Sequence, residues 1–532
     1  MAGQLQIPMR GTEVETRPMY VEEWLDSLPY IDFQNTIVVL YKALQASNKV
    51  AMKSGQRMEL VTLYHRPYQY YLDTQIRSGA QHTLQTIETM QTQLGGMMQL
   101  AVELARASRL AVDEALSHKS LWGQNKYPVQ AMLMALIYLS HVLILNFLEY
   151  APTPQKIWKE MNFIYQFTEN VNQHRAQVKP VSSNKKSNTS TIEHAFKRSI
   201  MISLADPYHL PFGAIWEIFE QLGSWAAHVE LKPFQKVDDP NGVFVININS
   251  DNSPLPYSKF NVANATEHHR LVDTGKLQKI IRHHLDKVEN GNKPDEELVF
   301  SEYYADYMLR IIHKAWGLPP KRYHQRKTRT GQLNLAHGLN SIYFYLNHEQ
   351  DFRQLADDGQ EDEIIAGEEH SSVSTTSICY QKEPWNLVDA SGGGFAVMRE
   401  EKPGNAIQVG DLVGLSLDEK NLPQESFRIG ILRWLLVRQS KIYKAGIQLL
   451  NQQIFAGGVR ASEGNRMERE FRRAVLTGNP VKQSELCVIT NKGLYRPDRD
   501  IDIFFKARKY GARITDMVES TSCFDQFNIK IS

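Results

Sequence analysis

The chain has 532 residues, of which 42% are hydrophobic and 22% are charged, and its formal net charge is +1. These values are typical of a globular protein of three or four domains, and they exclude a chain-wide electrostatic attraction to nucleic acid. Three widely separated cysteines, Cys379, Cys487 and Cys523, exclude a disulfide framework and a zinc ribbon and favour the reducing cytoplasm.

The first third of the chain is predicted to be helical. The N-terminal 18 residues are polar and contain no apolar signal core. A helix is expected over Gln81–Leu116, interrupted at Gly95-Gly96. Thr153-Pro154 precedes a further amphipathic helix. We therefore expect a helical bundle over residues 1–180.

The segment Val129–Tyr150 is long and apolar enough to approach the length of a membrane span. Ser140, His141 and Asn146 interrupt its apolar surface, and few basic residues flank it. A helix that is hydrophobic all round is also typical of a bundle core. We therefore predict a buried helix rather than a membrane span, with His141 as a core residue.

Residues 190–317 are expected to form a mixed, mostly helical region. Helices broken near Pro207 and Pro211 precede a strand at Gly242–Asn249. Further helices are expected over Lys276–Val288 and Glu302–Trp316. The histidine pairs at 268–269 and 283–284 have no acidic or cysteine partners at ligand spacing, so we interpret them as surface residues rather than metal ligands.

A basic cluster follows Pro319-Pro320. Lys321, Arg322 and Arg326 lie in the sequence KRYHQR, and the two arginines form an R-x-x-x-R motif. The preceding prolines favour an extended start to this segment. A guanidinium group can bind phosphate with two hydrogen bonds and can stack on a purine. The cluster is therefore a candidate binding arm for a phosphorylated ligand.

A second polar motif lies between two apolar runs in Asn386–Val397. Its residues Asp389, Ser391 and Gly394 form D-x-S-x-x-G, which is expected on a tight turn between two strands. The glycine run would open the backbone to a ligand. Turn capping by the aspartate and serine is the structural alternative.

An acidic, serine-rich insertion, residues 351–383, separates the two motifs. Its composition predicts a solvated loop. The alternative is an acidic flap that competes for the arginines when no ligand is bound.

Short strands are expected on both sides of the motifs, at Leu333–Leu346, Asp411–Leu417, Phe427–Val437 and Ile442–Leu450. A basic-acidic helix is expected over Gly464–Leu476. The remaining apolar segments after it predict a small C-terminal β unit.

The two motifs, in this order and followed by a strand pattern, resemble the signature of the PilZ family over residues 318–452. This resemblance implies a six-stranded antiparallel β-barrel that binds cyclic diguanylate (cyclic di-GMP). By motif position, Arg322 and Arg326 would bind the phosphates and guanines, with Lys321 keeping the arm basic. Asp389 would accept the guanine N–H groups, Ser391 would serve a phosphate or amino group, and Gly394 would keep the turn open. Whether one or two ligands bind is left open.

The predicted fold class is multidomain α+β. The expected divisions are a helical bundle (1–180), a mixed region (190–317), a PilZ-like barrel with the acidic insertion (318–455) and a small β unit (456–532).

The expected function is that of a cytoplasmic bacterial second-messenger receptor, with no cofactor other than its ligand. The helical region would relay the signal to a motility, pilus or exopolysaccharide partner, without nucleic acid or an integral membrane segment. The alternative is a PilZ-fold adaptor that no longer binds nucleotide. The chain contains no Walker loop, G-x-S-x-G, H-E-x-x-H or Rossmann fingerprint, so we do not expect an enzyme.

Overall fold

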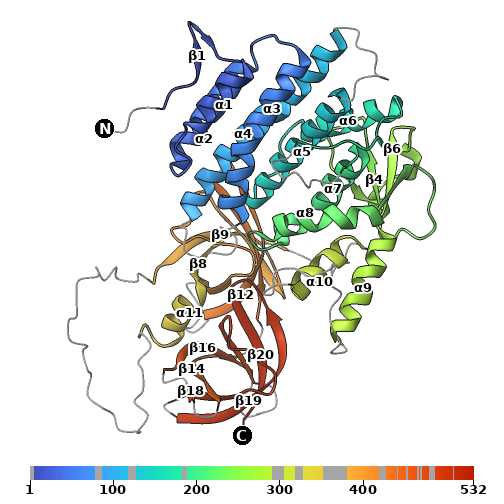
Figure 1. Cartoon of the computed structure of the whole chain (residues 1–532). Coiled ribbons are helices and arrows are strands. Elements are labelled where there is room, and N and C mark those ends of the chain that lie inside the picture. The colour runs from blue at the N-terminus through green and yellow to red at the C-terminus, as the bar shows by residue number, and fades with distance from the viewer. Residues whose placement is uncertain are drawn as a thin grey trace. The chain divides into compact units, whose positions relative to one another are not determined.

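The structure, a computed structural model, forms two compact units (Figure 1). The first unit contains Met1–Phe300 and Met308–Pro320, and the second contains Ser301–Tyr307 and Lys321–Ser532. The residues that the structure describes are 5–77, 87–117, 127–181, 189–289, 305–317, 327–350, 380–417, 427–439, 441–450, 453–463, 466–467, 470–478, 486–506 and 508–531.

The first unit is mostly helical, as the sequence predicts. A two-stranded hairpin, β1 (Met9–Arg10) and β2 (Glu13–Val14), precedes its helices. The described α-helices up to residue 317 are α1 (Pro18–Asp26), α2 (Phe33–Ser47), α3 (Ser54–Tyr71), α4 (Ile87–Ser117), α5 (Tyr127–Leu148), α6 (Ile157–Asn170), α7 (Ile192–Leu204), α8 (Ala214–Trp225), α9 (Gly275–Glu289) and α10 (Ala305–Ala315).

The helix α5 lies in the core of the first unit. By length and composition Pro128–Leu148 would pass for a membrane span, but 94% of its most apolar 18-residue window is buried inside the protein. His141 is buried, and its Nδ1 lies 3.1 Å from the Tyr68 hydroxyl. Ser140 shares a 2.6 Å hydrogen bond with Ser199. The expectation of a buried bundle helix is therefore confirmed, because these polar groups find partners on neighbouring helices.

The predicted break at Gly95-Gly96 is wrong, because α4 runs through both glycines without interruption. A Cβ atom at Gly96 would lie 3.1 Å from the Ile37 side chain on α2. The missing side chain thus allows close helix packing, which outweighs the low helix propensity of glycine.

A small sheet packs beside these helices. Its strand order is β3-β6-β4-β5, formed by Glu230–Pro233, His269–Asp273, Val243–Asn247 and Leu255–Pro256. The strand expected at Gly242–Asn249 is β4, whereas β3, β5 and β6 were not predicted.

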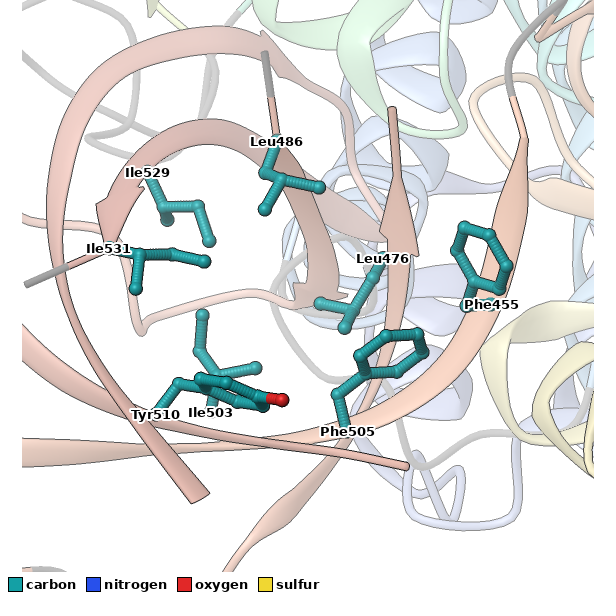
Figure 2. Close-up of a pocket in the computed structure, with 8 residues that line it drawn as sticks. All are labelled: Phe455, Leu476, Leu486, Ile503, Phe505, Tyr510, Ile529 and Ile531. Atoms are coloured by element: carbon teal, nitrogen blue, oxygen red, sulfur yellow. The ribbon is translucent and has the colours of Figure 1, made fainter. Parts of the chain in front are cut away.

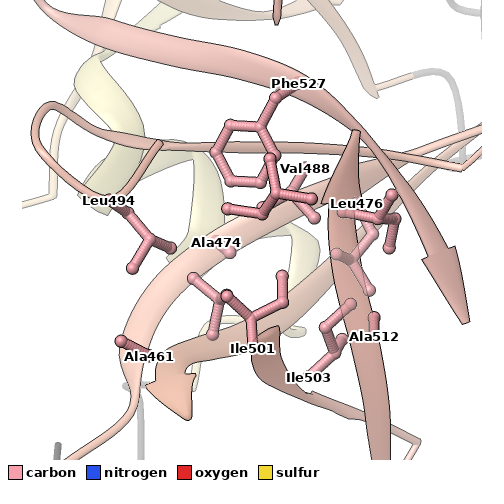
Figure 3. Close-up of a cluster of buried hydrophobic side chains, with 12 residues drawn as sticks. Ala461, Ala474, Leu476, Val488, Leu494, Ile501, Ile503, Ala512 and Phe527 are labelled. Atoms are coloured by element: carbon pink, nitrogen blue, oxygen red, sulfur yellow. The ribbon is translucent and has the colours of Figure 1, made fainter. Parts of the chain in front are cut away.

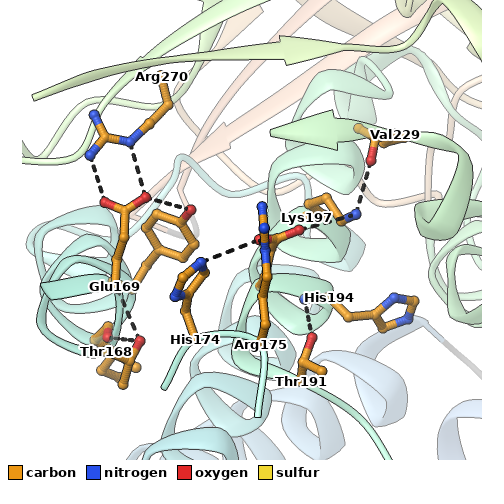
Figure 4. Close-up of polar contacts among 12 residues, drawn as sticks. Thr168, Glu169, His174, Arg175, Thr191, His194, Lys197, Val229 and Arg270 are labelled. Carbon is orange, nitrogen blue, oxygen red and sulfur yellow. Dashed lines mark hydrogen bonds and ion pairs between the residues drawn. The ribbon is translucent and has the colours of Figure 1, made fainter. Parts of the chain in front are cut away.

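An ion pair connects this sheet with α6, and a hydrogen bond connects α7 with the residue before β3 (Figure 4). Arg270 of β6 donates to both carboxylate oxygens of Glu169 on α6, at 3.2 and 2.6 Å. Burial acts to raise the pKa of Glu169, but the hydrogen bonds and charge of Arg270 outweigh it, so the pKa lies below its ordinary value. On α7, Lys197 donates to the Val229 carbonyl at 2.9 Å. These contacts stabilise the sheet against the helices.

The first part of the second unit is a closed antiparallel barrel. Six strands pair in the order β8-β9-β10-β13-β12-β11, and β11 returns to β8. They are β8 (Gln332–His337), β9 (Lys382–Ser391), β10 (Gly394–Arg399), β11 (Leu412–Leu417), β12 (Phe427–Arg438) and β13 (Ile442–Leu449), with the short β7 (Lys327–Thr328) added on β9. The predicted six-stranded antiparallel barrel is confirmed.

The strand predicted over Leu333–Leu346 is only half right. β8 ends at His337, and Gly338–Leu346 form helix α11. Gly338 has a φ of 80°, a left-handed conformation that ends the strand. The apolar run that follows is therefore a helix, which local pattern alone does not distinguish from a strand.

The C-terminal part is a second closed barrel. Its six strands are β14 (Ile454–Glu463), β16 (Arg472–Thr477), β17 (Cys487–Asn491), β18 (Asp500–Phe505), β19 (Arg508–Ser520) and β20 (Phe524–Ile531). The short β15 (Arg466–Met467) pairs with the end of β14. The predicted helix over Gly464–Leu476 is wrong in its described residues, because β16 pairs with both β14 and β17.

The two barrels have the same strand connectivity. In each, strand 1 pairs with 2, 2 with 3, 3 with 6, 6 with 5, 5 with 4, and 4 with 1. Apolar residues that include Val488, Ile501, Ala512 and Phe527 fill the second barrel (Figure 3). The expected small β unit is therefore a topological repeat of the first barrel.

The helix α11 lies in a core shared by the two barrels. Its residues Leu339 and Ile342 pack in one cluster with Ile431 of the first barrel and with Val475 and Phe524 of the second. The two barrels therefore bury apolar surface against each other within one compact unit.

Candidate functional site

The D-x-S-x-x-G motif forms the hairpin between β9 and β10. Asp389 lies opposite Ala396, and Ser391 lies opposite Gly394. The Ser391 hydroxyl donates a 3.3 Å hydrogen bond to the Gly394 carbonyl. Asp389 and Ser391 are both half-buried. The strand-to-strand turn expected for this motif is thus present, with its polar side chains at one end of the barrel.

Gly394 is required by close packing rather than by an unusual backbone conformation. A Cβ atom there would lie 2.1 Å from the Ile447 carbonyl oxygen on β13. Gly394 is not among the described residues with positive φ. Gly394 therefore allows β10 and β13 to approach closely, which differs from the turn flexibility that the sequence suggested.

Lys321, Arg322 and Arg326 lie outside the described residues. The chain that follows them is described: β7 pairs with β9, with Lys327 opposite Ala390 and Thr328 opposite Asp389. Lys327 and Arg329 are both exposed. The backbone leaving R-x-x-x-R therefore runs beside the strand that carries D-x-S-x-x-G.

The acidic insertion is only partly described. Residues 351–379 lie outside the described residues, whereas Lys382 and Glu383 begin β9 and do not belong to a solvated loop. Glu383 pairs with Arg399 at 3.1 Å and accepts a 2.7 Å hydrogen bond from the Gly404 amide. The last residues of the predicted loop are therefore part of the barrel.

A series of side-chain contacts connects the motif end of the first barrel to the second barrel. Gln448 lies opposite Gly394 in the β10–β13 pairing and accepts a 2.7 Å hydrogen bond from Arg433. Arg433 also donates to Glu519 of β19 through both terminal guanidinium nitrogens, with Nη2 at 2.9 Å from Oε2. Burial acts to lower the pKa of Arg433, but Glu519 raises it above its ordinary value. The sequence did not predict this contact, because nothing local pairs residues 86 apart.

A second cross-barrel cluster surrounds Asp411, which is buried. His337 Nε2 lies 2.7 Å from Asp411 Oδ2, and the Cys523 thiol donates to Oδ1 at 2.8 Å. Burial alone would lower the pKa of His337, but the charge and hydrogen bond of Asp411 raise it overall. Burial and Asp411 raise the pKa of Cys523, which disfavours a reactive thiolate.

Among the described residues, no group of three or more His, Cys, Asp or Glu side chains is arranged to hold a metal ion. The interpretation of the histidine pairs as surface residues is wrong for His269 and His284, which are buried. His269 Nδ1 accepts a 3.0 Å hydrogen bond from the Thr266 amide. It is therefore part of the fold of the small sheet.

A closed six-stranded barrel with this motif on its second hairpin defines the class of PilZ-domain proteins, and the chain belongs to the PilZ-domain family. Two family models match it: the N-terminal domain of the cyclic-di-GMP receptor FimW over residues 20–236, and the middle PilZ domain of FimW over residues 243–383. The chain is similar to the cyclic-di-GMP receptor FimW of Pseudomonas aeruginosa strain PAO1, with 21% identity over 97% of this chain and 91% of the relative. No solved structure matches the chain.

The ranges of these matches bear on the two motifs differently. The middle-domain match includes the basic cluster at 321–326 and ends six residues before Asp389, at residue 383. The D-x-S-x-x-G motif is therefore assigned from its own residues and from the hairpin that carries it. The division into four domains and the individual ligand contacts stay predictions.

Proposed function

We propose that this chain is a cytoplasmic receptor for cyclic di-GMP. The observation that carries the proposal is the pairing of β7 with β9, in which the residues directly after R-x-x-x-R lie opposite Asp389 and Ala390. A ligand on this end of the barrel would meet both motifs. The similarity to a cyclic-di-GMP receptor along almost the whole chain supports the same ligand class.

Each motif residue has a chemical role in the proposal. Arg322 and Arg326 bind the two phosphates and donate to guanine O6 and N7, with Lys321 adding positive charge. Asp389 accepts hydrogen bonds from the guanine ring N–H and amino group. Ser391 donates to a phosphate or accepts from an amino group. Gly394 maintains the barrel wall below them, because its Cβ position is occupied by the Ile447 carbonyl.

The signal is proposed to pass through the basic cluster itself. The chain passes between the two compact units at three places, and the last of them, between Pro320 and Lys321, lies next to the arginines. Both guanidinium groups can reach one molecule of cyclic di-GMP only if the basic arm curls. The ligand therefore binds the curled arm more tightly than the extended arm, and this difference in affinity favours the curled state. Proline φ angles are fixed, so Pro319-Pro320 would transmit the change rather than absorb it. The helical unit would then present a different surface to a motility, pilus or exopolysaccharide protein.

Calorimetric titration of the full chain with cyclic di-GMP tests the binding. Arg326→Ala and Asp389→Ala should each weaken it by about 1.5–3 kcal/mol, because each removes a hydrogen bond to a charged group. Asp516→Ala, which removes an exposed carboxylate from β19, is the matched control and should bind like wild type. If the wild-type protein is folded but shows no saturable binding of cyclic di-GMP, the result would favour the alternative hypothesis of a PilZ-fold adaptor that no longer binds nucleotide.

Small-angle scattering tests the relay separately. Curves of the wild type with and without saturating cyclic di-GMP should differ, whereas those of Arg326→Ala should coincide. Binding without any change in the wild-type curve would contradict the relay and leave the receptor proposal standing.

A further inference from the structure

An apolar cavity lies at one end of the second barrel (Figure 2). Its volume is about 170 Å³, and Phe455, Leu476, Leu486, Ile503, Phe505, Tyr510, Ile529 and Ile531 line it. Barrel interiors are normally packed to the density of organic crystals, so a space of this size is unusual. A cavity of about 150 Å³ with apolar walls accommodates one benzene ring.

The cavity occupies the end of the barrel that corresponds to the motif end of the first barrel. Leu476 is near the end of strand 2 and Leu486 directly precedes strand 3. Phe455 is near the start of strand 1, and Ile531 ends strand 6. In the first barrel, Ser391 ends strand 2 and Gly394 begins strand 3 at this same end. No D-x-S-x-x-G stands between strands 2 and 3 of the second barrel.

The rim of the cavity is basic. Lys506 Nζ lies 5.8 Å from the centre of the Phe455 ring and 5.3 Å from that of Phe505, so the ammonium group is beside two cavity walls. Among the described residues within three positions of the strand ends here, the charged side chains are Asp502, Lys506, Arg508, Lys509 and Lys530. Lys509 is ion-paired with Asp502 at 3.0 Å. The remaining charge favours an anionic partner.

One polar group lies among the apolar walls. The Tyr510 side chain carries the only oxygen among the eight drawn in Figure 2. Within the described part of the chain, its hydroxyl makes no hydrogen bond to protein. It can therefore donate to a carbonyl or carboxylate beside the apolar group that enters the cavity.

We propose that this end of the second barrel binds an acidic peptide segment of a partner protein, with one phenylalanine-sized side chain inserted in the cavity. Cavity size selects a single ring over a long acyl chain, because apolar pockets that bury larger ligands have volumes of about 300–1,000 Å³. The lysines at the rim select acidic flanking residues. The two barrels thus share one topology and use the same end for different ligands, and this inference does not depend on nucleotide binding by the first barrel.

The test uses the full chain with labelled isoleucine methyl groups and the peptide acetyl-Asp-Asp-Phe-Asp-Asp-amide. The methyl resonances of Ile503, Ile529 and Ile531 should shift saturably, whereas that of Ile447 in the first barrel should not. A peptide with alanine in place of phenylalanine should bind at least tenfold more weakly. Equal binding of the two peptides, or no shift at the three cavity methyls, would overturn the proposal.

Two variants separate the cavity from its rim. Ile531→Trp fills the cavity and should abolish peptide binding while leaving the cyclic di-GMP titration unchanged. Lys506→Asp reverses a rim charge and should weaken the peptide at least fivefold, whereas Lys441→Asp on an exposed turn of the first barrel should not. Equal losses for the two aspartate variants would show general charge attraction and overturn the site.

Binding of the cavity to a lipid membrane, rather than to a peptide, is the other outcome that must be tested. Phosphatidylglycerol vesicles are added to the full chain and to Ile531→Trp, and the sedimented protein is measured. Vesicle binding that requires the open cavity, without binding of the phenylalanine peptide, would assign the site to lipid and overturn the peptide proposal.

Discussion

Thr328 lies directly opposite Asp389 in the antiparallel pairing of β7 with β9. This register is the structural link between two motifs that are separated by more than sixty residues in the sequence. Because β7 starts one residue after Arg326, the pairing restricts where the basic arm can end. The consequences for stability and signalling can be tested residue by residue.

Gly394→Ala should destabilise the second unit by about 1–3 kcal/mol, because the added Cβ overlaps the Ile447 carbonyl oxygen. Chemical unfolding of the full chain measures the change. Gly392→Ala is the matched control, since a Cβ atom there meets nothing within 4 Å. Equal effects of the two alanines would show that backbone flexibility of the turn, and not contact with β13, explains the glycine at 394.

Arg433 and Glu519 should be energetically coupled across the two barrels. A double-mutant cycle of Arg433→Met and Glu519→Gln should give a coupling energy of about 0.5–3 kcal/mol, because the pair is partly buried and bidentate. Additive effects would mean that the ion pair contributes nothing to the interface. Titration of the same variants with cyclic di-GMP would show whether the contact of Arg433 with Gln448 affects ligand binding.

Ile342→Ala should cost about 2–5 kcal/mol, because this fully buried side chain of α11 lies in the core shared by both barrels. The loss should lower hydrogen-exchange protection in β12 and in β17 together. Ile503→Ala is the comparison variant, because Ile503 belongs to the core of the second barrel and not to the core shared by both barrels. Loss of protection confined to the first barrel in Ile342→Ala would contradict a shared cooperative core.

The contribution of His337 to stability should depend on pH. Burial acts to lower the pKa of His337, but the charge and hydrogen bond of Asp411 and the charge of Glu383 outweigh it, so the pKa is raised in the folded protein. Asp411 also accepts a hydrogen bond from the Cys523 thiol. The stabilisation is therefore complete below the unfolded pKa of about 6.5 and is lost as the pH rises through the folded pKa. The difference in unfolding free energy between wild type and His337→Gln should thus be larger at pH 6 than at pH 9.

His348→Asn, at an exposed histidine of the same unit, is the control for that pH series. Its difference from wild type should stay constant over the same range. If His337→Gln also shows a constant difference, the ion pair with Asp411 does not form in solution.

The sequence by itself determined the fold class and the strand-to-strand turn that carries D-x-S-x-x-G. Alternating apolar residues in Ile442–Leu449 and the turn at Asp389–Gly394 are local signals, and both mark the elements that the structure contains. The buried helix α5 was also predictable, because Ser140, His141 and Asn146 would be costly in lipid. These features depend on residues close together in the chain.

Only the tertiary structure decided the other features. Gly338–Leu346 is apolar in a way that suits a strand or a helix, and its packing between the barrels favours the helix. Arg472–Thr477 is a strand because β14 and β17 complete its hydrogen bonds on both sides. The repeat of one connectivity in two barrels arises from pairings between distant strands, which no local period of the sequence encodes.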